Sequence, residues 1–254
     1  MELQQKTIAV TGAGRGLGEA MALRLANQGC KLALIDLDES AVAETAGRCA
    51  ESGADVETYE ANVVSESDVE RLFSDIAGRF GALHGLVNNA GITRDALTLK
   101  YNKKGQLVDK MSLAQWQVVM DVNLTGVFLC GREAAAKMIE LECPGCIINI
   151  SSISRNGNFG QLNYSASKAG VEAMAVVWAK EFARYGVRAA SIAPGFIGTD
   201  MVNAMKPEAR KKMTSKIPLA RVGEPDEIAS TVQFILENDY VNGRCFEIDG
   251  GLRL

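Results

Sequence analysis

Short apolar runs alternate with longer amphipathic segments along most of the chain, and the two periods predict strands and helices in turn. The predicted strands lie in KTIAV, in LALIDL ending at Asp36, from Val56 to Ala61, in LHGLVNNAG, from Cys146 to Ser152, from Arg188 to Ala193 and in RCFEIDGG. The predicted helices run to Gly29 after a glycine-rich turn, from Glu39 to Glu51, from near Ser65 to Phe80, from Leu113 to Leu141, through Tyr164 and Lys168, over residues 201–216, where the segment is expected to be mobile, and in GEPDEIASTVQFIL.

Seven strands that alternate with helices of these lengths predict an α/β fold. The sheet is expected to be parallel, seven-stranded and doubly wound in the Rossmann manner, with right-handed crossovers and helices on both faces. We expect a bend or break near Asn123 in the long helix. No linker or low-complexity segment divides the sequence, so one domain over residues 1–254 is the simplest account.

Residues 95–111, DALTLKYNKKGQLVDKM, interrupt this alternation. Two runs of alternating apolar and polar residues, LTLKY and QLVDK, flank Asn102-Lys103-Lys104-Gly105, a sequence suited to a four-residue turn. We therefore predict an inserted β-hairpin or ordered flap near the carboxyl edge of the sheet, with a mobile polar loop as the alternative. The pocket walls are expected to come from this insertion, residues 155–162 and residues 196–216.

The helix that carries Tyr164 continues as AGVEAMAVVWAKEFA, which is apolar on more than one face. A helix of this kind is buried between neighbouring elements or between subunits. A homo-oligomer, a dimer or a tetramer, is therefore expected.

Composition narrows the class of protein without naming its chemistry. The 254 residues are 47% hydrophobic and carry a formal charge of −4, so the chain is expected to be soluble and globular and shows no basic footprint for nucleic acid or an anionic membrane. No apolar stretch reaches about 18 residues, and no secretory signal is evident, so the cytoplasm is the expected location.

Two of the six cysteines form CPGC at Cys143 and Cys146. The other four are scattered and His84 is the sole histidine, so no zinc site is expected. A redox pair should open a helix, whereas this one precedes a predicted strand. Incidental thiols are the main interpretation and a regulatory disulfide is the alternative.

The segment TGAGRGLG places Gly12, Gly16 and Gly18 between a strand and a helix. Glycines allow the backbone to approach a pyrophosphate, which then faces free amides and the positive end of the helix dipole. Asp36 ends the next strand 18 residues after Gly18, close to the spacing of a ribose-binding carboxylate. Together these features predict a dinucleotide site.

Asp36 also bears on which dinucleotide binds. A carboxylate accepts hydrogen bonds from the ribose hydroxyls of NAD and repels the additional phosphate of NADP. Arg15 in the glycine-rich loop favours NADP instead, because a guanidinium pairs with a 2′-phosphate. We expect NAD(H) to be preferred, since the strand end fixes Asp36, with NADP(H) as the alternative.

Tyr164 and Lys168 stand four residues apart in NYSASK and therefore lie on one face of their helix. An ammonium close to a phenol favours the phenolate, which predicts a lowered pKa for Tyr164 and a proton donor and acceptor at that position. The alternative is an ordinary pair of surface side chains.

These motifs together resemble the classical short-chain dehydrogenase/reductase family over essentially the whole chain. The resemblance rests on TGxxxGxG at Thr11 to Gly18, NNAG at Asn88 to Gly91, YxxxK at Tyr164 to Lys168 and PG at Pro194-Gly195. NNAGITRD, INISS and IDGG look most like bacterial 3-oxoacyl-[acyl-carrier-protein] reductases and acetoacetyl-CoA reductases.

The resemblance implies a mechanism and four catalytic residues. Tyr164 would exchange a proton with the substrate oxygen, and Lys168 would lower the pKa of the tyrosine and hold the nicotinamide ribose. A serine would hydrogen-bond the carbonyl, and Asn123 would support a water chain past Lys168 or, alternatively, relieve a helix kink. Ser152 is preferred over Ser151 because strand alternation decides which side chain faces the pocket.

The resemblance also implies the residues that contact the cofactor. They are Gly12, Arg15, Gly16, Leu17, Gly18, Asp36, Asn62, Val63, Asn89, Ala90, Gly91, Tyr164, Lys168, Pro194, Gly195, Ile197 and Thr199. Asn62 replaces the aspartate that the family usually has against adenine. Cys143 and Tyr185 stand where carrier-protein reductases commonly place docking arginines, which weakens the case for a carrier-linked substrate.

The leading hypothesis is thus an NAD(P)-dependent oxidoreductase that interconverts a ketone and a secondary alcohol, with a 3-oxoacyl thioester as the expected substrate. Other hypotheses are a dehydrogenase of a non-thioester secondary alcohol, a nucleotide-sensing protein without catalysis, and thiol redox chemistry at CPGC.

Overall fold

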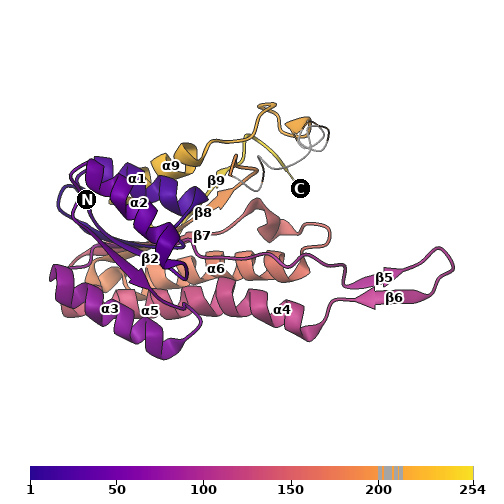
Figure 1. Cartoon of the computed structure of the whole chain (residues 1–254), viewed down its shortest axis with the longest axis horizontal. Helices are drawn as coiled ribbons and strands as arrows, with labels where there is room; N and C mark the ends of the chain where they lie inside the picture. The colour runs from indigo at the N-terminus through magenta and orange to yellow at the C-terminus, as the bar shows by residue number, and fades with distance from the viewer. Residues whose placement is uncertain (200–201, 203–207, 209–210, 212–213, 254) are drawn as a thin grey trace.

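Seven parallel strands form the central sheet of the computed structural model, which describes residues 1–199, 202, 208, 211 and 214–253 (Figure 1). Their order in the sheet is β3-β2-β1-β4-β7-β8-β9. The strands are β1 Thr7–Thr11, β2 Lys31–Asp36, β3 Val56–Glu60, β4 Gly85–Asn88, β7 Gly145–Ile150, β8 Val187–Pro194 and β9 Cys245–Ile248. The order turns back at β1 and β4, so the predicted doubly wound α/β fold is confirmed.

Helices cover both faces of this sheet (Figure 1). Helices α1 Gly16–Asn27, α2 Glu39–Glu51 and α9 Pro225–Glu237 pack on one face. Helices α3 Glu66–Phe80, α5 Gly126–Glu140 and α6 Leu162–Glu181 pack on the other. Successive residues of β1 show the reason, because Ile8 and Val10 enter the first core whereas Ala9 enters the second.

Local sequence signals fix the ends of several helices. The carboxylate of Asp38 accepts from two amides in the first turn of α2, and Ser65 caps α3. Gly81 ends α3 with φ of 66°, a left-handed conformation that suits glycine. Ser112 and Gln115 form a capping box at α4, Leu113–Met120.

The long helix expected from Leu113 to Leu141 is interrupted at the predicted place. A π-helical turn, η1 Asp121–Thr125, separates α4 from α5 and contains the buried Asn123. Such turns insert one additional residue and are frequent at functional sites.

The residues 95–111 carry a hairpin of β5 Leu99–Tyr101 and β6 Leu107–Lys110, which pair antiparallel. It projects away from the body of the molecule beyond the start of α4 (Figure 1). Every residue of the two strands is exposed and none lines the large cleft described below. The expectation that this insertion forms a wall of the pocket is therefore wrong, because its strands extend outward instead of folding back.

Two further boundaries differ from the sequence-based expectation. Strand β7 ends at Ile150, before Ser151 and Ser152, because the Ser152 hydroxyl accepts from the amide of Ser154 and opens the short 3-10 turn η2, Ile153–Asn156. A second such turn, η3 Ala183–Tyr185, follows α6. Most of the helix expected over residues 201–216 lies outside the described residues. None of the helices in the described part of the chain is long and apolar enough to cross a membrane.

Candidate active site

The carboxyl ends of the strands border one long cleft of about 660 Å³. Ligands of open α/β sheets bind at this edge, next to the point where the strand order reverses. The predicted site residues that line it are Gly12, Arg15, Leu17, Asp36, Asn62, Val63, Asn89, Ala90, Gly91, Ser152, Tyr164, Lys168, Pro194, Gly195, Ile197 and Thr199. Gly16, Gly18 and Asn123 are not among the lining residues; Gly18 and Asn123 are buried, and Gly16 is half-buried.

The glycine-rich loop between β1 and α1 forms a cradle that leaves no room for side chains. A Cβ on Gly18 would lie 2.0 Å from the carbonyl oxygen of Gly12, and one on Gly12 would lie 2.9 Å from Cα of Ala90. Gly12 also has φ of 64°, which L side chains rarely adopt. Asn89 Nδ2 donates to the carbonyl of Gly12 at 2.9 Å and so ties this loop to the end of β4. A backbone surface of this kind fits the pyrophosphate of a dinucleotide.

Two carboxylates stand at the next strand end. Asp36 accepts from the amide of Gly14 at 2.9 Å and from that of Leu37 at 2.8 Å, so its position is fixed. Asp38 and Arg15 are both exposed and both line the cleft. This region of the cleft therefore offers carboxylates to ribose hydroxyls and one guanidinium to a phosphate.

The remaining predicted cofactor contacts border the space between these two regions and the catalytic residues. Asn62 and Val63 follow β3, and the side-chain oxygen of Asn62 accepts from the amide of Val64 at 3.2 Å. On the other side, the amide of Thr199 donates to the carbonyl of Ile197 at 2.8 Å in the loop after β8. These positions extend the cleft on both sides of the glycine-rich loop.

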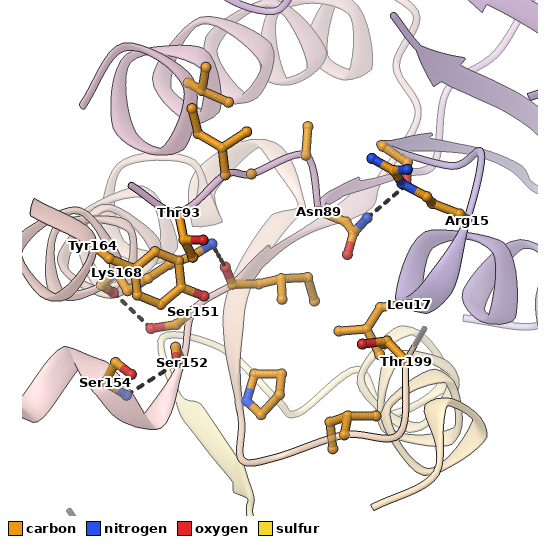
Figure 2. Close-up of a pocket in the computed structure, with 18 of the residues that line it drawn as sticks. Arg15, Leu17, Asn89, Thr93, Ser151, Ser152, Ser154, Tyr164, Lys168 and Thr199 are labelled. Carbon is orange, nitrogen blue, oxygen red and sulfur yellow. Dashed lines mark hydrogen bonds between the residues drawn. The ribbon is translucent and has the colours of Figure 1, made fainter. Parts of the chain in front are cut away.

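Tyr164 and Ser152 lie together in the cleft, on the side away from Arg15 (Figure 2). The hydroxyl of Ser152 lies near enough to the phenol of Tyr164 to lower the pKa of that phenol. The hydroxyl of Ser151 instead donates to the carbonyl of Lys168 at 2.7 Å and is buried. Of the two serines, Ser152 is thus the one placed to act together with Tyr164.

Lys168 lies one helical turn beyond Tyr164, and its ammonium is 5.6 Å from the centre of the phenol ring. The ammonium donates to the carbonyl of Ile150 at 2.7 Å, and the residue is only 4% exposed. Burial lowers the pKa of Lys168 to about 8. The side chain therefore remains mostly protonated at neutral pH.

The pKa of Tyr164 differs from the sequence-based expectation. Burial raises it above the usual value, the hydrogen bond from Ser152 lowers it, and the charge of Asp95 raises it further. The expectation of a lowered pKa is wrong for this structure, because desolvation disfavours the phenolate more than its neighbours favour it. Tyr164 thus holds its proton at neutral pH.

Asn123 uses its side chain to fix the backbone beside the cleft. Its oxygen accepts from the amide of Ile92 at 2.8 Å, and its nitrogen donates to the carbonyl of Ile92 at 2.9 Å. A Cβ on Gly91 would lie 3.3 Å from the Asn123 oxygen and 3.5 Å from the Lys168 ammonium. The π-helical turn therefore places the Asn123 side chain beside Gly91, where the Lys168 ammonium also lies.

Sequence reasoning did not single out several polar residues of the wall beside Tyr164. Gln161 accepts from the hydroxyl of Ser154 at 3.0 Å and from Asn158 at 2.9 Å, and it donates to Asp95 at 2.9 Å. Ser154, Asn158 and Gln161 line the cleft. Two of them fall within the expected range 155–162, but their mutual contacts depend on how the loop folds.

All six cysteines are free thiols, including Cys143 and Cys146. Cys146 is fully buried in β7, and burial raises its pKa to about 11, so its thiolate is disfavoured. The structure therefore gives the CPGC segment no disulfide.

Comparison with known proteins adds the chain's relatives to this geometry. A family model described as enoyl-(acyl carrier protein) reductase matches residues 12–253. The 3-oxoacyl-[acyl-carrier-protein] reductase of Synechocystis sp. is 40% identical over 98% of this chain and 98% of its own. Enzymes of the same name from Staphylococcus aureus and Thermotoga maritima are 37% and 36% identical, over 97% and 99% of this chain and 98% and 99% of their own.

A solved structure shares the architecture. The putative gluconate dehydrogenase of Agrobacterium tumefaciens superimposes with a TM-score of 0.90 at 35% identity, covering 98% of this chain and 96% of its own. Sequence and fold thus point to one and the same group of proteins.

Proposed function

The chain belongs to the short-chain dehydrogenase/reductase family of NAD(P)-dependent oxidoreductases that act on CH–OH groups, and we propose that it reduces 3-oxoacyl thioesters with NADH. One observation supports this chemistry most directly: Ser152 and Tyr164 line the same cleft, with the Lys168 ammonium 5.6 Å from the centre of the Tyr164 ring. The names of the full-length relatives supply the substrate class.

Each of the three side chains has a distinct task in this reaction. The bound dinucleotide supplies the hydride that converts the carbonyl carbon into an alcohol carbon. Ser152 donates a hydrogen bond to the carbonyl oxygen as negative charge develops there. Tyr164 gives its phenolic proton to that oxygen, and the Lys168 ammonium stabilises the phenolate that remains. The raised pKa of Tyr164 suits this direction, because the phenol is protonated before the reaction begins.

The preference for NADH rests on the carboxylates of Asp36 and Asp38 at the far end of the cleft. Two amides hold Asp36 in place, whereas the Arg15 side chain is exposed at the rim of the cleft. An additional phosphate on the ribose would stand near two negative charges. The glycine-rich cradle itself accepts either dinucleotide.

For the leaving portion of the thioester we propose coenzyme A ahead of a carrier protein. Cys143 and Tyr185 occupy the positions where related reductases commonly carry arginines. Tyr185 is 43% exposed and stacks under the guanidinium of Arg184, whose centre lies 4.7 Å from the ring. This surface therefore offers less positive charge to an acidic carrier.

A second candidate substrate is a polyhydroxylated acid. Ser154, Asn158 and Gln161 give the wall beside Tyr164 three polar side chains, and the solved relative is named a putative gluconate dehydrogenase. Hydroxyl groups of a sugar acid would find hydrogen-bond partners on this wall.

A screen at 340 nm separates these functions. Purified protein is incubated with NADH or NADPH and acetoacetyl-CoA, a carrier-linked 3-oxoacyl thioester or simple ketones, and with NAD⁺ and gluconate. We expect the highest kcat/KM for acetoacetyl-CoA with NADH, and none with the Tyr164→Phe variant. Turnover of gluconate or ketones without turnover of either thioester would contradict the thioester proposal, and a preference for NADPH would contradict the cofactor proposal.

We also propose that the protein is a homo-oligomer. The outer face of α6 exposes Val176 and Val177, which are 38% and 48% exposed, and α5 exposes Phe128 at 42%. Apolar side chains gathered on neighbouring helices favour association. Sedimentation velocity at micromolar concentration should give a dimer or tetramer, and a monomer would contradict the proposal.

A further inference from the structure

Arg155 lies three residues after Ser152 and donates two hydrogen bonds to the carbonyl of Ser152. Its amide donates to the carbonyl of Ser152 at 3.1 Å, and its guanidinium Nη1 reaches the same oxygen at 3.4 Å. The Ser152 hydroxyl in turn accepts from the amide of Ser154 at 3.1 Å. The polar groups of Ser152 are therefore held by the two residues that open η2.

The guanidinium of Arg155 extends from this turn to two other elements. It pairs with Glu172 on α6 and, through Nη2 at 2.6 Å, with Glu247 on β9. Its side chain is only 10% exposed, and those of Glu172 and Glu247 are 31% and 33% exposed, so these pairs are partly shielded from solvent. Arg253 balances the second carboxylate, with Nη1 at 2.9 Å from Glu247.

Glu172, which pairs with Arg155, lies on the helix that also carries Tyr164 and Lys168. Tyr164, Lys168 and Glu172 are spaced at intervals of four residues and so lie on one face of α6. Arg155 therefore joins the turn that carries Ser152 to the helix that carries Tyr164, at a point one helical turn beyond Lys168. The guanidinium is not part of the cleft wall, so it does not contact substrate.

From these contacts we propose that Arg155 is a positioning residue, which holds the Ser152 hydroxyl in register with Tyr164 by clamping η2 to α6 and β9. The proposal rests on the proposed function, since it assigns Arg155 to the same serine and tyrosine. Without the guanidinium, the Ser152 carbonyl loses a donor and the carboxylates of Glu172 and Glu247 lose the cation between them. A displacement of about 1 Å at a reacting group costs roughly 100-fold in rate.

A double-mutant cycle tests this coupling. In the wild-type background, Arg155→Met should lower kcat for acetoacetyl-CoA about 10- to 100-fold while leaving the KM for NADH within about twofold. In the Ser152→Ala background the same substitution should have almost no further effect, because the group that it positions is gone. Equal reductions in both backgrounds would show a merely structural role and would overturn the proposal.

Two further variants keep the test sound if Arg155→Met folds poorly. Glu172→Gln breaks only the pair with α6 and should lower kcat in the same direction by a smaller factor. Arg253→Met is the matched control, because Arg253 also pairs with Glu247 but is 71% exposed and does not touch Ser152. Unchanged kcat in both Arg155→Met and Glu172→Gln would contradict the proposal.

Hydrogen–deuterium exchange distinguishes failure of this proposal from failure of the proposed function. Amides in a peptide spanning residues 151–158 should exchange faster in Arg155→Met than in wild type or Arg253→Met, whether or not any thioester is turned over. A wild-type protein without thioester activity would contradict the proposed function alone. Unchanged exchange in folded Arg155→Met would contradict the clamp alone.

Discussion

The two edges of the central sheet belong to the same strands but differ in what their polar groups contact. At the carboxyl edge, strands end in glycines, serines and carboxylates that open onto the cleft, as at Gly12, Asp36 and Ser152. At the amino edge, polar groups are paired with one another, as where Arg188 donates to the carbonyls of Ile235, Leu236 and Val241. Substitutions at the carboxyl edge should therefore change the reaction rate and cofactor choice, whereas substitutions at the amino edge should change stability.

The largest effect is expected from Tyr164→Phe at the carboxyl edge. The substitution removes only the phenolic oxygen, and loss of a general acid costs about 1000-fold in kcat. The ring still fills its place, so the melting temperature should stay within about 2 °C of wild type and NADH should still bind. Initial rates at 340 nm, differential scanning fluorimetry and NADH fluorescence titration measure the three quantities. A large loss of stability would contradict the expectation that substitutions at the carboxyl edge change the rate and leave stability unchanged.

At the amino edge, Arg188→Met should show the reverse pattern. The guanidinium satisfies three carbonyl groups at and beyond the end of α9 and pairs with Asp239 at 3.3 Å, and its side chain is 12% exposed. The carbonyl of Leu236 keeps the Met1 amine as a donor, but losing the guanidinium from the three part-buried carbonyls and from Asp239 should lower the free energy of unfolding by about 3 kcal/mol. Urea denaturation followed by circular dichroism gives this value.

Arg184→Met is the matched control for that experiment, because Arg184 is exposed and only stacks on Tyr185. Its effect should stay within about 0.5 kcal/mol. For Arg188→Met, the KM for NADH should remain unchanged at temperatures where the protein is folded. A changed cofactor affinity would show that the two edges communicate.

Asp36→Ala should change cofactor choice without a large change in stability. Removing the carboxylate removes its repulsion of a 2′-phosphate, so the ratio of kcat/KM for NADPH to that for NADH should rise about 10- to 100-fold. Asp38→Asn preserves the helix cap in shape and should shift the ratio less, since Asp38 is more exposed. A ratio that moves equally in both variants would assign the discrimination to net charge instead of to the fixed carboxylate.

Sequence periodicity was sufficient to predict the strands and helices whose local pattern of apolar and polar residues is clear. The doubly wound parallel sheet follows from alternating strands and helices, and α2 and α3 lie where they were expected, at Glu39–Glu51 and Glu66–Phe80. A bend or break was predicted near Asn123, and the π-helical turn η1 lies there. Strands β1 and β2, with their clear apolar runs, lie within one residue of the expected segments.

Features that depend on long-range packing were beyond the sequence. The pKa of Tyr164 was predicted in the wrong direction, because spacing shows that Lys168 is near but not how deeply both groups are buried. Arg155 pairs with Glu172 and Glu247, which lie 17 and 92 positions further along the chain. No local sequence pattern indicates these pairs. The direction in which the hairpin projects depends on how its base docks, where the amide of Ala96 donates to the carbonyl of Gly160.

The smallest effect is expected at His84, on the amino edge, and it depends on pH. The imidazole Nδ1 accepts from the amide of Thr7 at 3.2 Å, and burial lowers the pKa of His84 from 6.5 to about 4. Protonation would place a proton against that amide. The unfolded chain binds this proton first, so the stabilisation is complete above pH 6.5 and is lost as the pH falls towards 4.

His84→Gln should therefore reduce the dependence of unfolding free energy on pH between 6.5 and 4 by about 1–2 kcal/mol, after screening of the half-buried ring is allowed for. Urea denaturation at pH 7 and pH 4.5 gives the two values, with Lys6→Gln as a control, because the charge of Lys6 is the lesser cause of the shift. Kinetic constants at pH 7 should be unchanged, since His84 lies at the opposite edge from the cleft. Parallel pH profiles for wild type and His84→Gln would show that acid destabilises the fold elsewhere.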